Sequence, residues 1–252
     1  MRHIAVDGPF AVFSDVHGNL PALEAVLADI AARNLRAAVC LGDLVGYGPW
    51  PNEVALLIRE RGIPTVMGNY DQGIGFASGD CGCVYRTDEQ RAEGAASLKW
   101  TTQVVSDEVR THLRSLDDAL VLETPGGQLL AVHGSPRRIN EYLFADRPQS
   151  AMERLARQFP YAAILCGHTH VPYVRRAADT LFVNDGSAGR PKDDDWRACY
   201  AVVDPATLDS SGGVTFVRVP YDFPRLLAGL AAAPLLTSYV APPDAVAETP
   251  SS

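Results

Sequence analysis

The chain has 252 residues, of which 47% are hydrophobic and 21% are charged, and its formal net charge is −8 at pH 7. This composition is that of an ordinary globular protein with enough length for a full core. The acidic balance and the absence of a basic block argue against non-specific binding to nucleic acid, and no apolar run reaches the roughly 18 residues that a membrane span needs.

The first half of the chain alternates predicted strands and helices. Strands are predicted over residues 10–14, 36–41 and 63–67, and helices over residues 21–33 and 51–61. In the first helix, Leu23, Val26 and Leu27 recur at the spacing of one helical face, and Ile30 continues it. The order strand, helix, strand, helix, strand predicts a parallel sheet with right-handed crossovers.

The second half is predicted to contain more β structure. Residues 69–86 are expected to form a long glycine-rich loop, before helices over residues 87–104 and 106–116. Apolar residues then alternate with a period of two, which predicts a hairpin of strands over residues 119–123 and 128–133. Further predicted elements are a helix over 150–159, a buried strand over 162–166, strand pairs 173–177 with 180–184 and 198–204 with 214–220, and a helix over 223–232.

The order of these elements predicts the fold class. An α/β half followed by a β-rich half favours a two-sheet β-sandwich flanked by helices, in an α-β-β-α arrangement. We find no internal repeat and no linker, so we expect a single domain over residues 1–240. Residues 241–252 are rich in Pro, Ala, Ser and Thr and are expected to form a disordered tail.

The N-terminus and the cysteines indicate the compartment. The first residues lack the pattern of a signal peptide, and five cysteines are an odd number in a chain too large to need disulfides. We therefore expect a cytoplasmic protein. Cys40 and Cys166 lie within apolar runs and are expected in the core, whereas Cys81 and Cys83 are expected to be loop thiols, because a one-residue spacing is not that of a zinc knuckle.

Several predicted strands end in polar side chains. Apolar runs lead into Asp15 and His17, into Asp43, into Asn69 and Asp71, into His133, and into His168 and His170. In parallel α/β sheets, ligands bind where the carboxyl ends of the strands converge. We therefore expect these side chains to gather at one edge of the fold.

The donor types in this set predict a metal centre. Carboxylate, imidazole and amide oxygen together suit Mn, Fe, Zn or Ni better than Ca. The ligands are too many for one tetrahedral ion and fit two ions that share a bridging carboxylate. Two ions about 3.5–4 Å apart can clamp a phosphoryl group and turn a bridging water into hydroxide.

In chain order, the motifs Asp15-x-His17, Gly42-Asp43, Gly68-Asn69-x-Asp71, His133 and Gly167-His168-x-His170 resemble those of the calcineurin-like metallophosphoesterases. Residues 42–53 and 184–191 are similar to segments of small prokaryotic single-domain members. The resemblance covers about residues 10–222.

The resemblance implies a role for each matched residue. It assigns Asp15, His17 and His170 to the first metal, Asp43 to the bridge, and Asn69, His133 and His168 to the second metal. It implies two divalent transition-metal ions as cofactors, with Mn²⁺ favoured over Fe, Ni or Zn. It also implies that a hydroxide between the two ions attacks phosphorus in line.

One position departs from the family pattern. The family usually has a histidine after Gly-Asn, where this chain has Tyr70. In the family that histidine contacts the phosphate and helps the leaving oxygen depart, and the following acid, here Asp71, orients it. Tyr70 could donate a hydrogen bond to a phosphate oxygen or form a wall of the pocket, and Asp71 could take part in catalysis or cap the loop. A phenol with a pKa near 10 is a poor proton donor.

Three further residues are candidate substrate contacts. Asn19 could face the phosphate or cap the first helix. Arg137, beside Arg138, could line the site or remain on the surface. Arg190, close to Lys192, could neutralise a substrate phosphate or belong to a solvated charged run.

We therefore expect a dinuclear metal-dependent phosphoesterase that hydrolyses a small phosphodiester, which could be nucleotide-derived. The alternatives are a phosphomonoesterase or Ser/Thr phosphoprotein phosphatase, and a non-catalytic scaffold of the same fold that binds partner proteins. The presence of every expected ligand argues against the scaffold.

Overall fold

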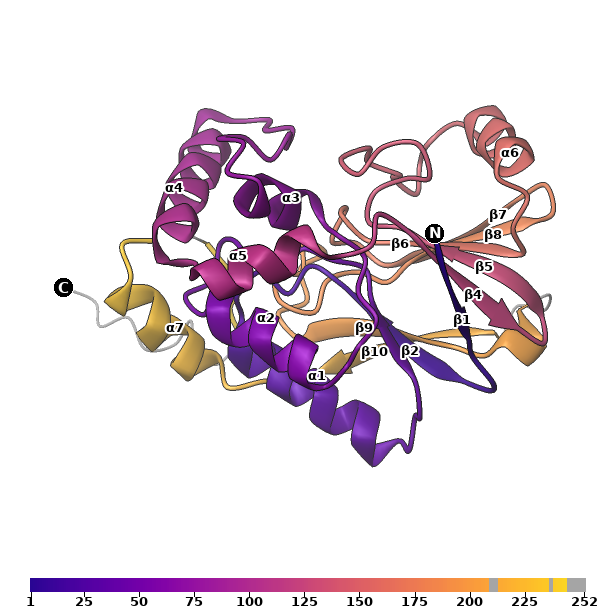
Figure 1. Cartoon of the computed structure of the whole chain (residues 1–252), viewed down its shortest axis with the longest axis horizontal. Coiled ribbons are helices and arrows are strands. Elements are labelled where there is room, and N and C mark those ends of the chain that lie inside the picture. Colours follow the sequence, from indigo (N-terminus) through magenta and orange to yellow (C-terminus); the bar gives the residue numbers. More distant parts are fainter. Residues whose placement is uncertain (209–212, 236–237, 244–252) are drawn as a thin grey trace.

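The structure is a computed structural model that describes residues 1–208, 213–235 and 238–243. It contains two β-sheets packed face to face between layers of helices (Figure 1). The predicted α-β-β-α sandwich is therefore confirmed. The part of the predicted tail that spans residues 244–252 lies outside the described residues.

The strands form one six-stranded and one four-stranded sheet. The first has the order β1-β4-β5-β6-β8-β7 and consists of β1 (Arg2–Ala5), β4 (Leu120–Thr124), β5 (Gly127–Ala131), β6 (Ala163–Cys166), β8 (Thr180–Asn184) and β7 (Tyr173–Ala177). The second has the order β10-β9-β2-β3 and consists of β10 (Val214–Val219), β9 (Ala198–Val203), β2 (Phe10–Phe13) and β3 (Ala38–Cys40). The predicted pairings β4 with β5, β7 with β8, and β9 with β10 are all antiparallel hairpins.

The helices cover the outer faces and one end of the sandwich. They are α1 (Leu20–Ala32), α2 (Pro51–Glu60), α3 (Asn69–Gly75), α4 (Asp88–Val104), α5 (Asp107–Arg114), α6 (Gln149–Gln158) and α7 (Phe223–Ala232), with a short 3-10 turn at Pro205–Thr207. In Figure 1, α6 lies above the six-stranded sheet, and α1, α2 and α7 lie on the other side of the molecule.

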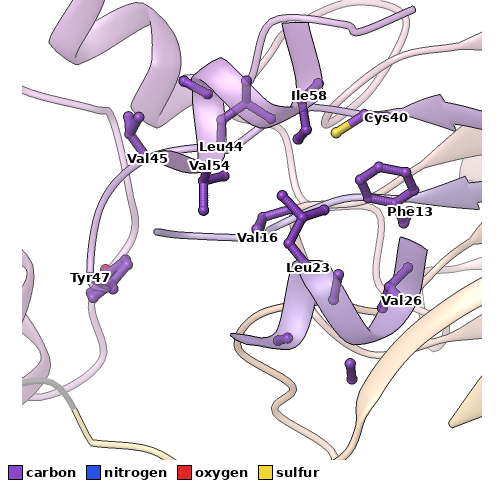
Figure 2. Packing of buried hydrophobic residues seen from close by; sticks show 14 of the residues in the cluster. Phe13, Val16, Leu23, Val26, Cys40, Leu44, Val45, Tyr47, Val54 and Ile58 are labelled. Carbon is purple, nitrogen blue, oxygen red and sulfur yellow. The ribbon is translucent and has the colours of Figure 1, made fainter. Parts of the chain in front are cut away.

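The side chains of β2 point alternately to its two faces, which shows how the layers form. Phe10 and Val12 point into the cluster between the two sheets, and Ala11 and Phe13 point toward the helices. Successive strand side chains face opposite ways, so a strand covered on both sides is apolar throughout. Figure 2 shows Phe13 packed among side chains of α1 and α2, such as Leu23.

Three predictions of secondary structure were wrong or incomplete. The segment 63–67 forms only isolated bridges, in which Thr65 pairs with Cys40 beside the smaller sheet and Val66 pairs with Asp117 beside the larger one. Because it passes from one sheet to the other, it cannot continue a ladder with either. Strand β1 was not predicted, since as an exposed edge strand it lacks an alternating apolar pattern.

The third difference is helix α3, which occupies the first part of the predicted loop 69–86. The glycines of this segment led to the prediction of a loop, yet Gly73 and Gly75 each lie where another segment approaches closely. A Cβ at Gly73 would lie 2.8 Å from the Asp80 carbonyl oxygen, and one at Gly75 would lie 3.2 Å from the Leu113 Cβ. Tertiary packing therefore outweighs the low helix propensity of glycine here.

Within the described parts of the chain, every helix falls short of the length and apolar character that crossing a bilayer requires.

Candidate metal centre

The seven predicted ligands converge at one end of the two sheets. Asp15 and His17 follow β2, and Asp43 follows β3 of the same sheet, whereas His133 follows β5 and the pair His168 and His170 follows β6 of the larger sheet. Asn69 is the first residue of α3. All seven side chains are buried, although burial of so many polar groups is costly without compensation.

The first group consists of Asp15, His17 and His170, whose ligand atoms lie within 4.8 Å of one another. Asp15 Oδ1 lies 3.3 Å from His170 Nε2 and 3.8 Å from His17 Nε2. The other carboxylate oxygen, Oδ2, accepts hydrogen bonds from Ser14 Oγ at 2.5 Å and from the His168 backbone N–H at 2.9 Å. One oxygen is thus anchored to the protein, and the other faces the two imidazoles.

The second group consists of Asp43, His133 and His168, whose ligand atoms also lie within 4.8 Å of one another. Asn69 joins this group, because its Oδ1 lies 2.9 Å from His133 Nε2. Its Nδ2 donates a hydrogen bond to the Cys81 carbonyl oxygen at 2.9 Å, which turns the amide oxygen toward the group.

Asp43 lies between the two groups. Its Oδ2 is 3.6 Å from His17 Nε2 and 3.5 Å from His133 Nε2, and its Oδ1 accepts a hydrogen bond from the Tyr70 backbone N–H at 2.8 Å. A single carboxylate therefore faces one histidine of each group. This is the arrangement that a ligand shared by two cations requires.

Backbone carbonyls set the tautomer of three histidines. The bonds are His17 Nδ1 to Val45 O at 3.0 Å, His133 Nδ1 to Leu41 O at 2.8 Å, and His170 Nδ1 to Arg190 O at 2.6 Å. Because a carbonyl oxygen only accepts, each Nδ1 carries a proton, and Nε2 is the ring atom that faces the centre. His17 Nε2 and His170 Nε2 face each other at 3.3 Å, which is unfavourable for two lone pairs unless a cation binds them.

The protonation states also suit a cation. Burial lowers the pKa values of His17, His168 and His170, so all three are neutral near pH 7. The ionised form of Asp15 is favoured because its Oδ2 accepts hydrogen bonds from Ser14 Oγ and from the His168 backbone N–H. Neutral imidazoles and an ionised carboxylate are the forms that bind metals.

Two buried atoms of the centre lack any hydrogen-bond partner within the described chain. They are Asp15 Oδ1 and His168 Nε2, and both belong to the two groups that could hold a metal ion. Unpaired buried polar atoms are rare in native proteins, because each costs about 1–3 kcal/mol. Burial and the nearby charges of Asp15 and Asp71 also raise the pKa of Asp43 well above its usual range. Divalent cations in both groups would relieve all of these penalties, so the residues present fit the two ions that the motifs imply.

The backbone is strained at the ligands. Positive φ angles occur at Asp15 (52°), His17 (48°), Asp43 (55°), His168 (66°) and His170 (62°). The left-handed region is unfavourable for residues other than glycine and costs of order 1–3 kcal/mol each. Such strain is typical of functional sites, where the surrounding structure holds side chains in a required direction.

Two positions near the centre require glycine because atoms of other ligand residues approach them closely. A Cβ at Gly68 would collide with the backbone and the Oδ1 atom of Asp43, and one at Gly167 would lie 2.7 Å from Asp15 Oδ2. The glycines that precede Asn69 and His168 in the sequence motifs therefore leave room for the carboxylates of the other ligands.

Tyr70 is buried beside the first group. Its ring makes an edge contact with His17 at a centroid distance of 5.3 Å and also packs on Tyr47. Its hydroxyl has no hydrogen-bond partner among the described residues, and burial raises its pKa well above the usual value. The ring therefore forms part of the wall behind His17.

The Asp71 side chain forms hydrogen bonds with the backbone. Its carboxylate accepts hydrogen bonds from the N–H groups of Asp43 at 2.8 Å, Leu44 at 2.9 Å and Gly68 at 2.9 Å. Asp71 therefore ties the start of α3 to the turn that carries the bridging carboxylate.

The three candidate substrate contacts are engaged with the protein. Asn19 caps α1 by accepting from Ala22 N–H and also donates to the Gly189 carbonyl oxygen. Arg190 pairs with Glu93 at 2.7 Å, and Arg137 pairs with Glu141. The structure thus places each of them in an internal hydrogen bond or ion pair.

The structure also brings residues to the centre that no sequence signal indicated. The Tyr142 ring stacks on His168 at a centroid distance of 3.9 Å. Cys81 and Cys83 are free thiols with their Sγ atoms 3.2 Å apart, and Cys83 Sγ lies 3.2 Å from Asn69 Nδ2. Their loop follows α3, which is why it reaches the second group.

Comparison with known proteins agrees with this geometry. A model of the calcineurin-like phosphoesterase superfamily domain matches residues 9–207. A protein of Methanocaldococcus jannaschii, described as uncharacterized, is 34% identical over 239 residues, which cover 87% of this chain and 90% of that protein.

Two crystal structures are similar over nearly their whole length. A metallophosphoesterase from Sphaerobacter thermophilus is 31% identical and has a TM-score of 0.74, with coverage of 93% of this chain and 97% of that chain. A hypothetical protein from Pyrococcus horikoshii OT3 is 27% identical and has a TM-score of 0.77, with coverage of 90% and 93%. The similarity therefore extends over most of the chain.

Proposed function

The chain belongs to the calcineurin-like phosphoesterase superfamily, and from this membership we propose that it is a dinuclear metal-dependent enzyme that hydrolyses a small phosphodiester. The observation that carries the proposal is the position of Asp43 Oδ2, which lies 3.6 Å and 3.5 Å from the Nε2 atoms of His17 and His133. The donor set contains carboxylates, imidazoles and one amide oxygen, which suits Mn, Fe, Zn or Ni, and of these the family resemblance favours Mn²⁺.

The residues of the chain have distinct roles in this reaction. Asp15, His17 and His170 would hold one ion, Asn69, His133 and His168 would hold the other, and Asp43 would be shared. Two ions held in this way would supply Lewis-acid activation of a phosphoryl oxygen and lower the pKa of a water nucleophile. The carbonyls of Val45, Leu41 and Arg190 keep three imidazoles in the ligand tautomer.

Tyr70 stands where the family has the histidine that helps the leaving oxygen depart. Burial raises the pKa of Tyr70 well above its usual value, so its hydroxyl is a very weak proton donor. A diester with a good leaving group needs less help from a general acid than one with a poor leaving group. We therefore expect hydrolysis to depend strongly on the acidity of the leaving alcohol.

The test is hydrolysis of bis-p-nitrophenyl phosphate by protein loaded with Mn²⁺. We expect turnover that requires the metal, and faster turnover of this diester than of p-nitrophenyl phosphate. Asp43→Asn should lower metal content and turnover by at least about tenfold, because it removes the shared negative charge. Asp179→Asn, at an exposed turn, is the matched control and should change neither.

Three outcomes would overturn all or part of the proposal. Unaltered activity of Asp43→Asn would exclude a shared carboxylate. Absence of turnover with every divalent metal, in protein that metal analysis shows to be loaded, would exclude hydrolysis. Faster turnover of the monoester than of the diester would identify the protein as a phosphomonoesterase instead of a phosphodiesterase.

A further inference from the structure

A buried ion pair lies behind the first group of ligands. Glu93 of α4 and Arg190, in the loop after β8, pair at 2.7 Å, and their side chains are only 12% and 11% exposed. Glu93 Oε1 also accepts a hydrogen bond from the Ser238 backbone N–H at 2.7 Å. A buried ion pair is often no more stabilising than apolar residues of similar size, so stability alone does not explain this one.

The main chain of Arg190 directs one histidine of the first group. Its carbonyl oxygen accepts the hydrogen bond from His170 Nδ1 at 2.6 Å. Its N–H donates to Ser187 Oγ at 2.8 Å, and the Ser187 hydroxyl donates to the Asp15 carbonyl oxygen at 2.8 Å. The direction of the His170 imidazole therefore depends on where the Arg190 main chain lies.

The side chain of Arg190 supports the other histidine through Tyr47. The guanidinium carbon lies 4.0 Å from the centroid of the Tyr47 ring, which is the geometry of a cation–π contact. The Tyr47 and His17 rings pack at 90° with their centroids 5.0 Å apart. Tyr47 also has a φ of 58°, which is unfavourable for a tyrosine, so its position depends on contacts with its surroundings.

One face of α4 supplies these contacts. Glu93 and Ser97 are four residues apart in α4, a spacing that places both on the same side of the helix. Ser97 Oγ accepts a hydrogen bond from the Tyr47 N–H at 2.7 Å, and Glu93 pairs with the guanidinium that lies over the Tyr47 ring. Helix α4 therefore fixes both the main chain and the ring of Tyr47.

We propose that Glu93 is a positioning residue of the metal centre, whose ion pair with Arg190 holds His17 and His170 in the directions that the first ion requires, an inference that rests on the two-ion centre of the proposed function. Glu93→Gln removes the charge and leaves the buried guanidinium without its counter-ion. A shift of Arg190 would move the supports of both histidines. The second group would keep its own support, in which His133 Nδ1 donates to the Leu41 carbonyl oxygen.

The test is isothermal titration calorimetry of the full, metal-free chain with Mn²⁺. We expect two ions to bind the wild type. Glu93→Gln should weaken one of them by about tenfold or more, as loss of support for a ligand does, and leave the other within about twofold. His170→Ala identifies the weakened ion, because it removes a ligand of the first group. In the His170→Ala background, Glu93→Gln should leave the affinity of the remaining ion unchanged.

Further variants separate positioning from a general loss of stability. Arg190→Gln keeps the main-chain carbonyl and should weaken the same ion, and the double variant with Glu93→Gln should lose no more than the larger single loss, because both changes break one contact. Asp29→Asn on α1 is the matched control. It alters a carboxylate that accepts from the Tyr200 hydroxyl at 2.6 Å, and it should leave both affinities unchanged.

Three outcomes would overturn the inference. They are unchanged affinity for both ions in Glu93→Gln, equal weakening of both ions, and additive losses in the double variant. Binding of fewer than two ions by the wild type would overturn the proposed function together with the inference. Calorimetry needs no turnover, so a failure to hydrolyse phosphodiesters would leave the role of Glu93 standing.

Discussion

At the scale of single residues, the ligands are directed by bonds to the protein as well as by the metals they would bind. His17, His133 and His170 each donate Nδ1–H to a backbone carbonyl oxygen, and Asp15 Oδ2 accepts from Ser14 and from the His168 backbone. Pre-set orientation of this kind lowers the cost of ordering the ligands when an ion binds. The strained positive φ angles at the same residues are consistent with side chains directed by their surroundings.

Tyr70 provides a test of the departure from the family motif. Tyr70→Phe removes a buried hydroxyl that has no hydrogen-bond partner within the described chain. We expect turnover within about twofold of the wild type and a free energy of unfolding that is unchanged or higher by about 1 kcal/mol. Stopped-flow or steady-state hydrolysis and urea unfolding measure the two quantities.

Tyr173→Phe is the control for Tyr70, because the Tyr173 hydroxyl donates to the Leu143 carbonyl oxygen at 2.6 Å. That variant should lose about 1 kcal/mol of stability. A fall in turnover of tenfold or more in Tyr70→Phe, at unchanged metal content, would show that the Tyr70 hydroxyl contacts the substrate.

At the scale of elements, α3 connects the helical end of the molecule to the metal centre. It begins with Asn69, and its first turn contains Asp71, which accepts from the backbone of the Asp43 turn. A shift of this helix would therefore move one ligand directly and the shared carboxylate indirectly. The glycines of α3 allow it to pack against the Asp80 carbonyl oxygen and Leu113.

Asp71→Asn tests this coupling. The amide has one acceptor oxygen where the carboxylate has two, and its NH₂ would face a backbone N–H of Asp43, Leu44 or Gly68. We expect a loss of about 2–3 kcal/mol in the free energy of unfolding and a loss of about tenfold or more in metal affinity. Urea unfolding and metal titration are the measurements.

Asp107→Asn, in the exposed first turn of α5, is the matched change and should leave metal affinity unaltered. If Asp71→Asn lowered stability but kept full metal affinity, Asp71 would be a helix cap without influence on the centre.

At the scale of the whole molecule, the centre joins the two sheets. Asp15, His17 and Asp43 follow strands of the smaller sheet, and His133 and His168 follow strands of the larger one. Ions bound between them would cross-link the sandwich and would couple metal binding to folding stability.

Removal of metal should therefore lower the melting temperature. An ion present at 100 times its Kd stabilises the folded state by about 2.7 kcal/mol, which corresponds to about 5–10 °C for a chain of this length. Differential scanning calorimetry of chelator-treated protein with and without added Mn²⁺ measures the shift. The shift should be smaller in Asp43→Asn. An identical melting temperature with every divalent metal tested would contradict a metal centre between the sheets.

Much of the fold could be predicted because its signals are local. The apolar run of β2 and the apolar face of α1 depend on residues close together in the chain. Strand β1, the segment 63–67 and helix α3 could not be predicted in the same way. Their conformations depend on an edge pairing, on bridges to two sheets, and on close packing of glycines against distant segments.

The sequence by itself determined the donor chemistry of the site, because each ligand follows an apolar run and the residue type decides which cations it suits. Only the tertiary structure decided which atoms meet. It turned Asp43 Oδ2 toward His17 and His133, joined Asp71 to the Asp43 turn, paired Arg190 with Glu93 and placed Tyr142 on His168. The physical reason is that these contacts link residues from different elements. Their geometry follows from how two sheets and their helices pack, and the pattern along any one segment does not contain it.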